Sequence, residues 1–409
     1  METTRNATLS DLVELLKDQQ GRRLDVVASA AAIRATDDGL IKVHGTEAVI
    51  DEDGVTPTDG TYRPTEMLHE GLSTKLGIPA GYLKRMHQVR PDVWAANVNG
   101  LLHGFRASSP ASTPGRVDAD PRSFLLRLFR GSDGGTGIAR AFLSDRYGIY
   151  DNFDGLLAVL DGTRKAGVEI NIDSCDLTDR RMYVKVVAPQ LAAYAPKLLE
   201  GYRSPFDGRK VGDGWTPERV ARASAEEGQQ LTDPPVVFAG FVFSNSEVGT
   251  GSWSITPRLV VKVCNNGLTI AADSLRGVHL GGKMDEGLVR WSQDTERKSL
   301  ELLSAKAADA VAAFLDVDYI TAQVAKMEEL AGTPVADAPK TIEKVTKALS
   351  FTEAQSASIL DHFIKGGQLT AGGVMQAVTS AAQTVSDADL AAEMESAAFR
   401  VLQLAASLS

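Results

Sequence analysis

Three arginines and a tyrosine in the middle of the chain have side chains suited to binding a phosphate group and a base. Arg127 and Arg140 lie in two predicted strands, and Arg146 stands next to Tyr147. A guanidinium group donates parallel hydrogen bonds to a phosphate, and an aromatic ring stacks on a base. These residues predict contacts with single-stranded nucleic acid. The alternative is that Asp145 pairs with a neighbouring arginine while Tyr147 packs in the core.

A polar loop with two glycines, N-S-E-V-G-T-G, connects two further predicted strands. Its hydroxyl, amide and glycine N–H groups are suited to contacting phosphate oxygens. The candidate contacts are Asn245, Ser246, Gly249, Thr250 and Gly251. A plain hairpin connection is the alternative, because Glu247 repels an anion. The loop also lacks the Lys-Ser/Thr pair of a P-loop, so nucleoside triphosphate binding has little support.

Lys283 and Arg290 supply two more cations near the start of a long predicted helix, residues 284–315. They would extend the same anion-binding surface. The alternative is that they only solvate the beginning of the helix.

The sequence contains no recognisable catalytic motif. Its six histidines occur singly, without H-E-x-x-H spacing, and the two cysteines, Cys175 and Cys264, are far apart. Asp173 and Asp176 near a predicted strand end would suit Mg²⁺ in a nuclease, with solvation of a turn as the alternative. We therefore expect no cofactor, no metal and no enzymatic activity.

The elements that must position these residues predict an α+β fold. Residues 236–270 alternate in period two and predict an antiparallel three-stranded meander. Helical spacing over residues 284–315 predicts a long helix packed on that central sheet. A small mixed region precedes the sheet, and Ala-rich helices follow the long helix.

Composition divides the chain at a stretch of small residues and prolines, A-S-S-P-A-S-T-P-G-R-V-D-A-D-P-R. The expected parts are a mixed N-terminal region with a helical group at 1–106, a linker at 107–122, an α+β core at 123–315 and a helical C-terminal region at 316–409.

Charge is distributed unevenly along the chain. The formal net charge is −10, with 23 basic and 22 acidic side chains in residues 121–300 but 7 and 14 in residues 301–409. An anion-binding face therefore belongs to the middle third. No apolar run is long enough for a membrane span, and the first residues do not have the pattern of a secretory leader. We expect a location in the bacterial cytoplasm.

Several motifs together resemble the phage/plasmid-like protein family, a domain of unknown function in bacteriophages, plasmids and mobile islands. They are L-G-I-P-A-G-Y-L, N-V-N-G-L-L, A-R-A-F-L-S-D-R-Y-G-I-Y-D-N, N-S-E-V-G-T-G, V-C-N-N-G-L, G-V-H-L-G-G-K, G-V-M-Q-A-V-T-S-A-A-Q and L-A-A-E-M-E-S-A-A-F-R-V-L. The order of a meander followed by a long helix is also similar to the phage single-strand annealing proteins of the RecT, Red-beta and Erf group. That likeness implies a homo-oligomer that binds or anneals single-stranded DNA in recombination or replication.

Two functions thus follow from the sequence. The first is binding of single-stranded DNA along the central sheet. The alternative is a non-catalytic interaction factor that binds a host or phage protein through its acidic helical C-terminus. A metal-dependent nuclease is the third.

Overall fold

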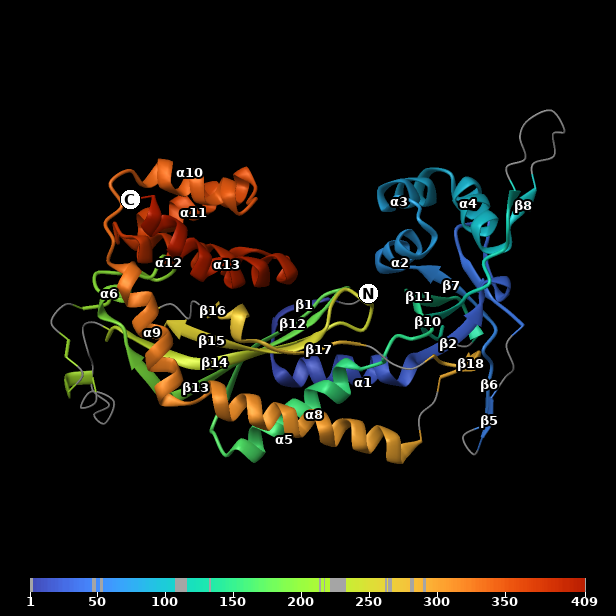
Figure 1. Cartoon of the computed structure of the whole chain (residues 1–409), viewed down its shortest axis with the longest axis horizontal. Coiled ribbons are helices and arrows are strands. Elements are labelled where there is room, and N and C mark those ends of the chain that lie inside the picture. The colour runs from blue at the N-terminus through green and yellow to red at the C-terminus, as the bar shows by residue number, and fades with distance from the viewer. Residues whose placement is uncertain are drawn as a thin grey trace.

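The chain folds as an α+β protein with two antiparallel-rich sheets and a helical C-terminal part (Figure 1). The computed structural model describes residues 3–45, 49–51, 54–106, 116–131, 134–212, 215–216, 218–220, 233–261, 263, 267–279, 283–289 and 292–408. Within that part of the chain, no helix combines the length and apolar character needed to cross a membrane.

Each of the two main sheets has seven strands among the described residues, and the one with the longer strands is called the larger sheet. It contains the predicted meander and is antiparallel throughout. Its order is β1-β12-β13-β14-β15-β16, with β17 also paired to β15. The strands are β1 (Thr4–Ala7), β12 (Asn171–Leu177), β13 (Met182–Tyr194), β14 (Val236–Asn245), β15 (Trp253–Val261), β16 (Gly267–Thr269) and β17 (Leu275–Gly277). The sequence V-V-F-A-G-F-V-F of β14 favours a strand because β-branched and aromatic side chains pack well on a pleated surface.

One face of the larger sheet is apolar and packs on helices, as predicted. Phe241, Phe243 and Ile255 are fully buried on this face. The helices below it are α1 (Leu9–Arg22), α5 (Asn152–Ala166) and α8 (Gln293–Phe314) (Figure 1). The predicted long helix is therefore α8. It begins at Gln293, where the Ser292 hydroxyl accepts a hydrogen bond from the Thr295 N–H, and not at residue 284.

The C-terminal helices lie over the opposite face of the same sheet, except the first of them, which runs from the end of α8 past the strands to that side (Figure 1). They are α9 (Val317–Ala331), α10 (Ala338–Ala348), α11 (Glu353–Gly366), α12 (Ala371–Thr384) and α13 (Ala388–Ser407), with the short α6 (Pro196–Leu199) between β13 and β14. Residues 371–382 of α12 are all buried. One hydrophobic core joins these helices to the larger sheet.

The smaller sheet has the order β18-β2-β10-β11-β7-β4-β3 and carries three helices on one side (Figure 1). The strands are β2 (Arg23–Ser29), β3 (Ile33–Ala35), β4 (Ile41–Val43), β7 (Gly60–Pro64), β10 (Ser123–Phe129), β11 (Gly137–Ser144) and β18 (Gly287–Leu288); the helices are α2 (Glu66–Leu76), α3 (Ala80–Val89) and α4 (Pro91–His103). Trp94 and Leu68 lie in its fully buried core. Two short pairs complete the fold: β5 (Val49–Asp51) with β6 (Gly54–Thr56), and β8 (Phe105–Arg106) with β9 (Arg116–Val117).

The sheets do not divide the chain at the expected linker. The hairpin β10–β11, expected beside the meander, pairs instead with β2 and β7 from the N-terminal region. Long apolar strands pair wherever their buried faces match, and β2 (R-L-D-V-V-A-S) matches β10 along seven residues. Residues 107–115 of the expected linker lie outside the described residues.

Candidate functional site

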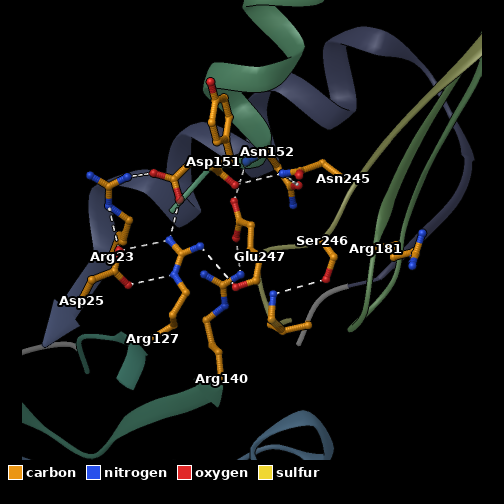
Figure 2. A network of polar contacts seen from close by, with 12 residues as sticks. Arg23, Asp25, Arg127, Arg140, Asp151, Asn152, Arg181, Asn245, Ser246 and Glu247 are labelled. Carbon is orange, nitrogen blue, oxygen red and sulfur yellow. Dashed lines mark hydrogen bonds and ion pairs between the residues drawn. The ribbon is translucent and has the colours of Figure 1, made fainter. Parts of the chain in front are cut away.

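Arg127 and Arg140 lie in a buried cluster of ion pairs where the two sheets meet (Figure 2). Arg127 is fully buried, and its Nε and Nη2 donate to the two carboxylate oxygens of Asp25 at 3.0 and 3.1 Å. Its Nη2 also donates to Asp151 Oδ1 at 2.5 Å. Arg140, which is 2% exposed, pairs with Glu247. The prediction that these two arginines contact phosphate is wrong, because both are buried and neutralised.

Glu247 brings the polar loop into this cluster. Its Oε1 accepts a hydrogen bond from the backbone N–H of Asn152 at 2.6 Å, and this N–H at the beginning of α5 has no partner inside the helix. Its other carboxylate oxygen, Oε2, accepts from Arg140. Burial opposes ionisation of Glu247, but Arg140 and Arg127 outweigh burial and lower its pKa to about 2. The loop therefore joins the two sheets in addition to turning the chain.

Two of the other predicted contacts in this loop, Asn245 and Ser246, are also internal. Asn245 is buried and donates from Nδ2 to Tyr150 O at 3.0 Å. Ser246 is buried, and its Oγ lies 2.9 Å from Thr250 Oγ1. Gly249 has φ +82° and lies so close to Leu143 that a Cβ would meet its side chain at 2.5 Å. Asn245 and Ser246 are thus not available to a phosphate, which corrects the prediction for them, whereas Gly249 is exposed and stays a candidate.

Tyr147, expected to stack on a base, stacks within the protein instead. Its ring lies parallel to that of His279 with 5.0 Å between centroids, and its hydroxyl donates to Ser246 O at 3.0 Å. Burial raises the pKa of Tyr147 to about 12. The core alternative for Tyr147 is therefore the correct one.

Arg146 and Lys283 are exposed, and their side chains have no ionic partner among the described residues. The Met284 N–H donates to Asp145 O at 3.0 Å, which brings the two segments together. Both stay candidates for anion contact. Arg290 lies outside the described residues.

Asp173 and Asp176, the pair considered for Mg²⁺, each neutralise an arginine. Asp176 is 1% exposed and accepts from Arg5 Nη1 at 2.6 Å and from the Asn6 N–H at 2.7 Å. Asp173 accepts from Arg258 Nη1 at 2.8 Å. Across the described part of the chain, no group of three His, Cys, Asp or Glu side chains is arranged to hold a metal ion. These residues therefore give no support to the nuclease alternative.

A row of polar side chains crosses the other face of the larger sheet, below α13. Tyr183 is paired with Ser244, Ser244 with Ser254, and Ser254 with Arg276, so the four lie side by side on neighbouring strands. The row spans about 14 Å at the backbone, because neighbouring strands lie about 4.8 Å apart. It forms the floor of a cavity of about 370 Å³. This cavity, with the adjoining one described below, is called the sheet groove.

Two arginines in the sheet groove have no carboxylate partner within the described residues. Arg181 Nη2 donates to Thr250 O at 2.5 Å, and its guanidinium lies against Gly251. A Cβ on Gly251 would lie 1.7 Å from Arg181 Nη2, so a larger residue at this position would displace the guanidinium. Arg276 is exposed at the end of the polar row. Of the predicted loop residues, Thr250 therefore lines the groove, and Gly251 lies against Arg181, which also lines it.

Helix α13 forms an acidic wall opposite this floor. Lys185 Nζ, itself buried, donates to Glu395 Oε1 at 2.8 Å. The Tyr183 hydroxyl donates to Asp389 Oδ1 at 2.8 Å, and burial together with Asp389 raises the Tyr183 pKa. Glu393 lines the same cavity and is exposed. The floor thus offers donors and the wall offers acceptors.

A second cavity of about 400 Å³ adjoins the first, since Arg180 and Asp389 line both. It extends the groove toward Glu66 and Met67 at the start of α2. Arg180 is 41% exposed and pairs with Glu70 of α2 at 2.6 Å. The sheet groove therefore continues from α13 to the helices of the smaller sheet.

The residues of the groove have a sequence signal that charge counting misses. Ser254, Thr256 and Arg258 alternate with apolar residues along β15, and this alternation indicates a strand with one polar face. Arg181 belongs to the turn T-D-R-R, where an arginine looks like an ordinary solvated residue. Its role depends on contact with Thr250 and Gly251, which are 69 and 70 positions away along the chain.

Comparison of the chain with protein-family models, curated proteins and solved structures finds no match in any of the three. The resemblance to phage and plasmid proteins therefore stays a prediction from the motifs.

Proposed function

We propose that this protein binds single-stranded nucleic acid, with DNA as the expected form, in the sheet groove. The observation that carries the proposal is the position of Arg181 and Arg276. These two arginines have no carboxylate partner among the described residues, and they lie beside a cavity floor that carries hydroxyl groups. Arg127, Arg140 and Arg258, in contrast, are buried in ion pairs. Guanidinium groups that have no carboxylate partner, and hydroxyl groups, are donors that often contact phosphate and sugar.

The shape of the groove favours a single strand. The sheet lies on one side and α13 on the other, so an occupant is contacted from two sides. A volume of about 370 Å³ lies in the range of pockets that hold small polar or aromatic groups such as a nucleotide. The net charge of −10 restricts strong phosphate attraction to local sites such as this one.

Salt dependence of binding tests this proposal. Binding of fluorescently labelled single-stranded DNA, followed by anisotropy, should weaken linearly in a plot of log affinity against log salt concentration. The double variant Arg181→Gln/Arg276→Gln should reduce the magnitude of the slope by about 1.4, because each lost phosphate contact on a single strand contributes about 0.7.

The matched control is Lys340→Gln/Lys344→Gln, which removes two exposed cations from α10 outside the groove. The slope of this control should equal that of the unchanged protein. Absence of binding at low salt, or an equal slope in both double variants, would refute the proposal.

A further inference from the structure

Of the three carboxylates on the acidic wall of the sheet groove, Glu393 alone is left without a partner in the described part of the chain. Glu395 is held by Lys185 at 2.8 Å, and Asp389 accepts the Tyr183 hydroxyl at 2.8 Å. Glu393 lies one helical turn after Asp389, is exposed and lines the cavity. Its carboxylate is ready to accept hydrogen bonds from an occupant of the groove.

The distribution of charge also orients an occupant. A phosphate is attracted to Arg181 and Arg276 on the floor and is repelled by Glu393 on the wall. The sugar and phosphate therefore lie on the floor side, and the base extends toward α13. This orientation brings the hydrogen-bonding edge of the base to the carboxylate.

We infer that Glu393 makes the groove select bases that present hydrogen-bond donors and reject thymine; this inference rests on the proposed function. An ionised carboxylate only accepts hydrogen bonds. Guanine presents two adjacent N–H donors, N1–H and N2–H, which match the two carboxylate oxygens. Cytosine and adenine each present one amino group. Thymine presents a single N–H flanked by two carbonyl oxygens that repel the carboxylate.

The expected order of affinity is therefore guanine first, cytosine and adenine next, and thymine last. When a side chain makes two hydrogen bonds to one base, the affinity for that base exceeds the affinity for a mismatched base by about fivefold or more. Electrostatic attraction at Arg181 and Arg276 is the same for every base, so it sets the affinity without setting this order.

Three labelled DNA strands of equal length and charge test the inference: thymine only, a T-T-C repeat and a T-T-G repeat. For the unchanged protein, anisotropy at one salt concentration should give affinity at least about fivefold tighter for the T-T-G repeat than for the thymine strand. The T-T-C repeat should lie between them. In Glu393→Gln the ratio should fall toward one, mainly through tighter binding of the thymine strand, because an amide both donates and accepts.

The matched control is Glu329→Gln on α9, which removes the same charge from an exposed residue that does not line the groove. It should leave the ratio unchanged. Equal affinity for all three strands, or a ratio unaffected by Glu393→Gln, would overturn the inference while leaving the proposed function standing. Absence of binding to any strand would refute the proposed function and this inference together.

Discussion

Glu247 connects three elements through one side chain. It accepts from Arg140 of β11 and from the N–H that begins α5, and its backbone oxygen accepts from Arg127 Nη1 at 3.3 Å. A buried charge is stable only when every partner is present, because removing one leaves the others unpaired in a medium of low dielectric constant. The cluster therefore makes the meeting of the two sheets depend on single residues.

Glu247→Gln should lower the free energy of unfolding by about 3 kcal/mol at neutral pH, since two buried arginines lose their shared countercharge. Urea denaturation measures this change, with Glu329→Gln as the exposed control, which should change stability by less than about 0.5 kcal/mol.

The pKa of Glu247 falls from its ordinary 4.5 to about 2 on folding. Its contribution is therefore fully present above pH 4.5 and is lost as pH falls toward 2. The difference between the two proteins should shrink over that interval, and a constant difference would contradict this assignment.

The sequence shows which side chains carry charge, but it does not show which of them pair with one another in the fold. Arginines in strands suggest phosphate contact when the sequence is considered alone. Asp25, which neutralises Arg127, is 102 positions away, and Glu247, which neutralises Arg140, is 107 positions away. The ion pairs therefore depend on tertiary contacts that no local pattern contains.

Secondary elements were more predictable than these pairs because their periodicity is local. The meander, the helices α2 to α4 and the helical C-terminus follow from spacing alone. The pairing of β10–β11 with β2 and β7 was not predicted, since several apolar strands of similar length were available as partners. Strand pairing is thus the level at which the prediction first departs from the structure.

The close packing of α5 on α8 depends on a glycine. A Cβ at Gly162 would lie 2.6 Å from Ser304 O and 2.7 Å from Ala307 Cβ. Gly162→Ala should therefore push the helices apart and destabilise the protein by about 1–3 kcal/mol. Gly100→Ala in α4 is the control, because its Cβ would meet nothing nearer than Phe105 at 3.9 Å. That control should be neutral or slightly stabilising in the same urea titration; equal stability of both variants would contradict the packing described.

The whole molecule is organised around the larger sheet, with α5 and α8 on its apolar face and α13 over the polar face (Figure 1). The C-terminal helices share their hydrophobic core with this sheet, so they are not a separate appendage. A protein-binding C-terminus attached to an independent scaffold, the alternative drawn from charge, is therefore harder to reconcile with the packing.

Deletion of residues 335–409 should consequently disrupt the sheet core as well as the helices. Removing α10 to α13 exposes side chains such as Val324 and Met327 of α9, which are now 3% and 1% exposed. The truncated chain should lose its cooperative thermal transition, followed by circular dichroism. A transition within a few degrees of the full chain would show that the helices fold apart from the sheet.

The most direct test of the central claim locates bound DNA on the protein. The full chain would be crosslinked by ultraviolet light to a single strand that contains 5-iodocytosine, and the modified peptides would be identified by mass spectrometry. We predict an adduct on the tryptic peptide 182–185, which carries Tyr183 on the floor of the sheet groove. Adducts confined to peptides outside the groove, such as the one that carries Tyr147, would contradict the account.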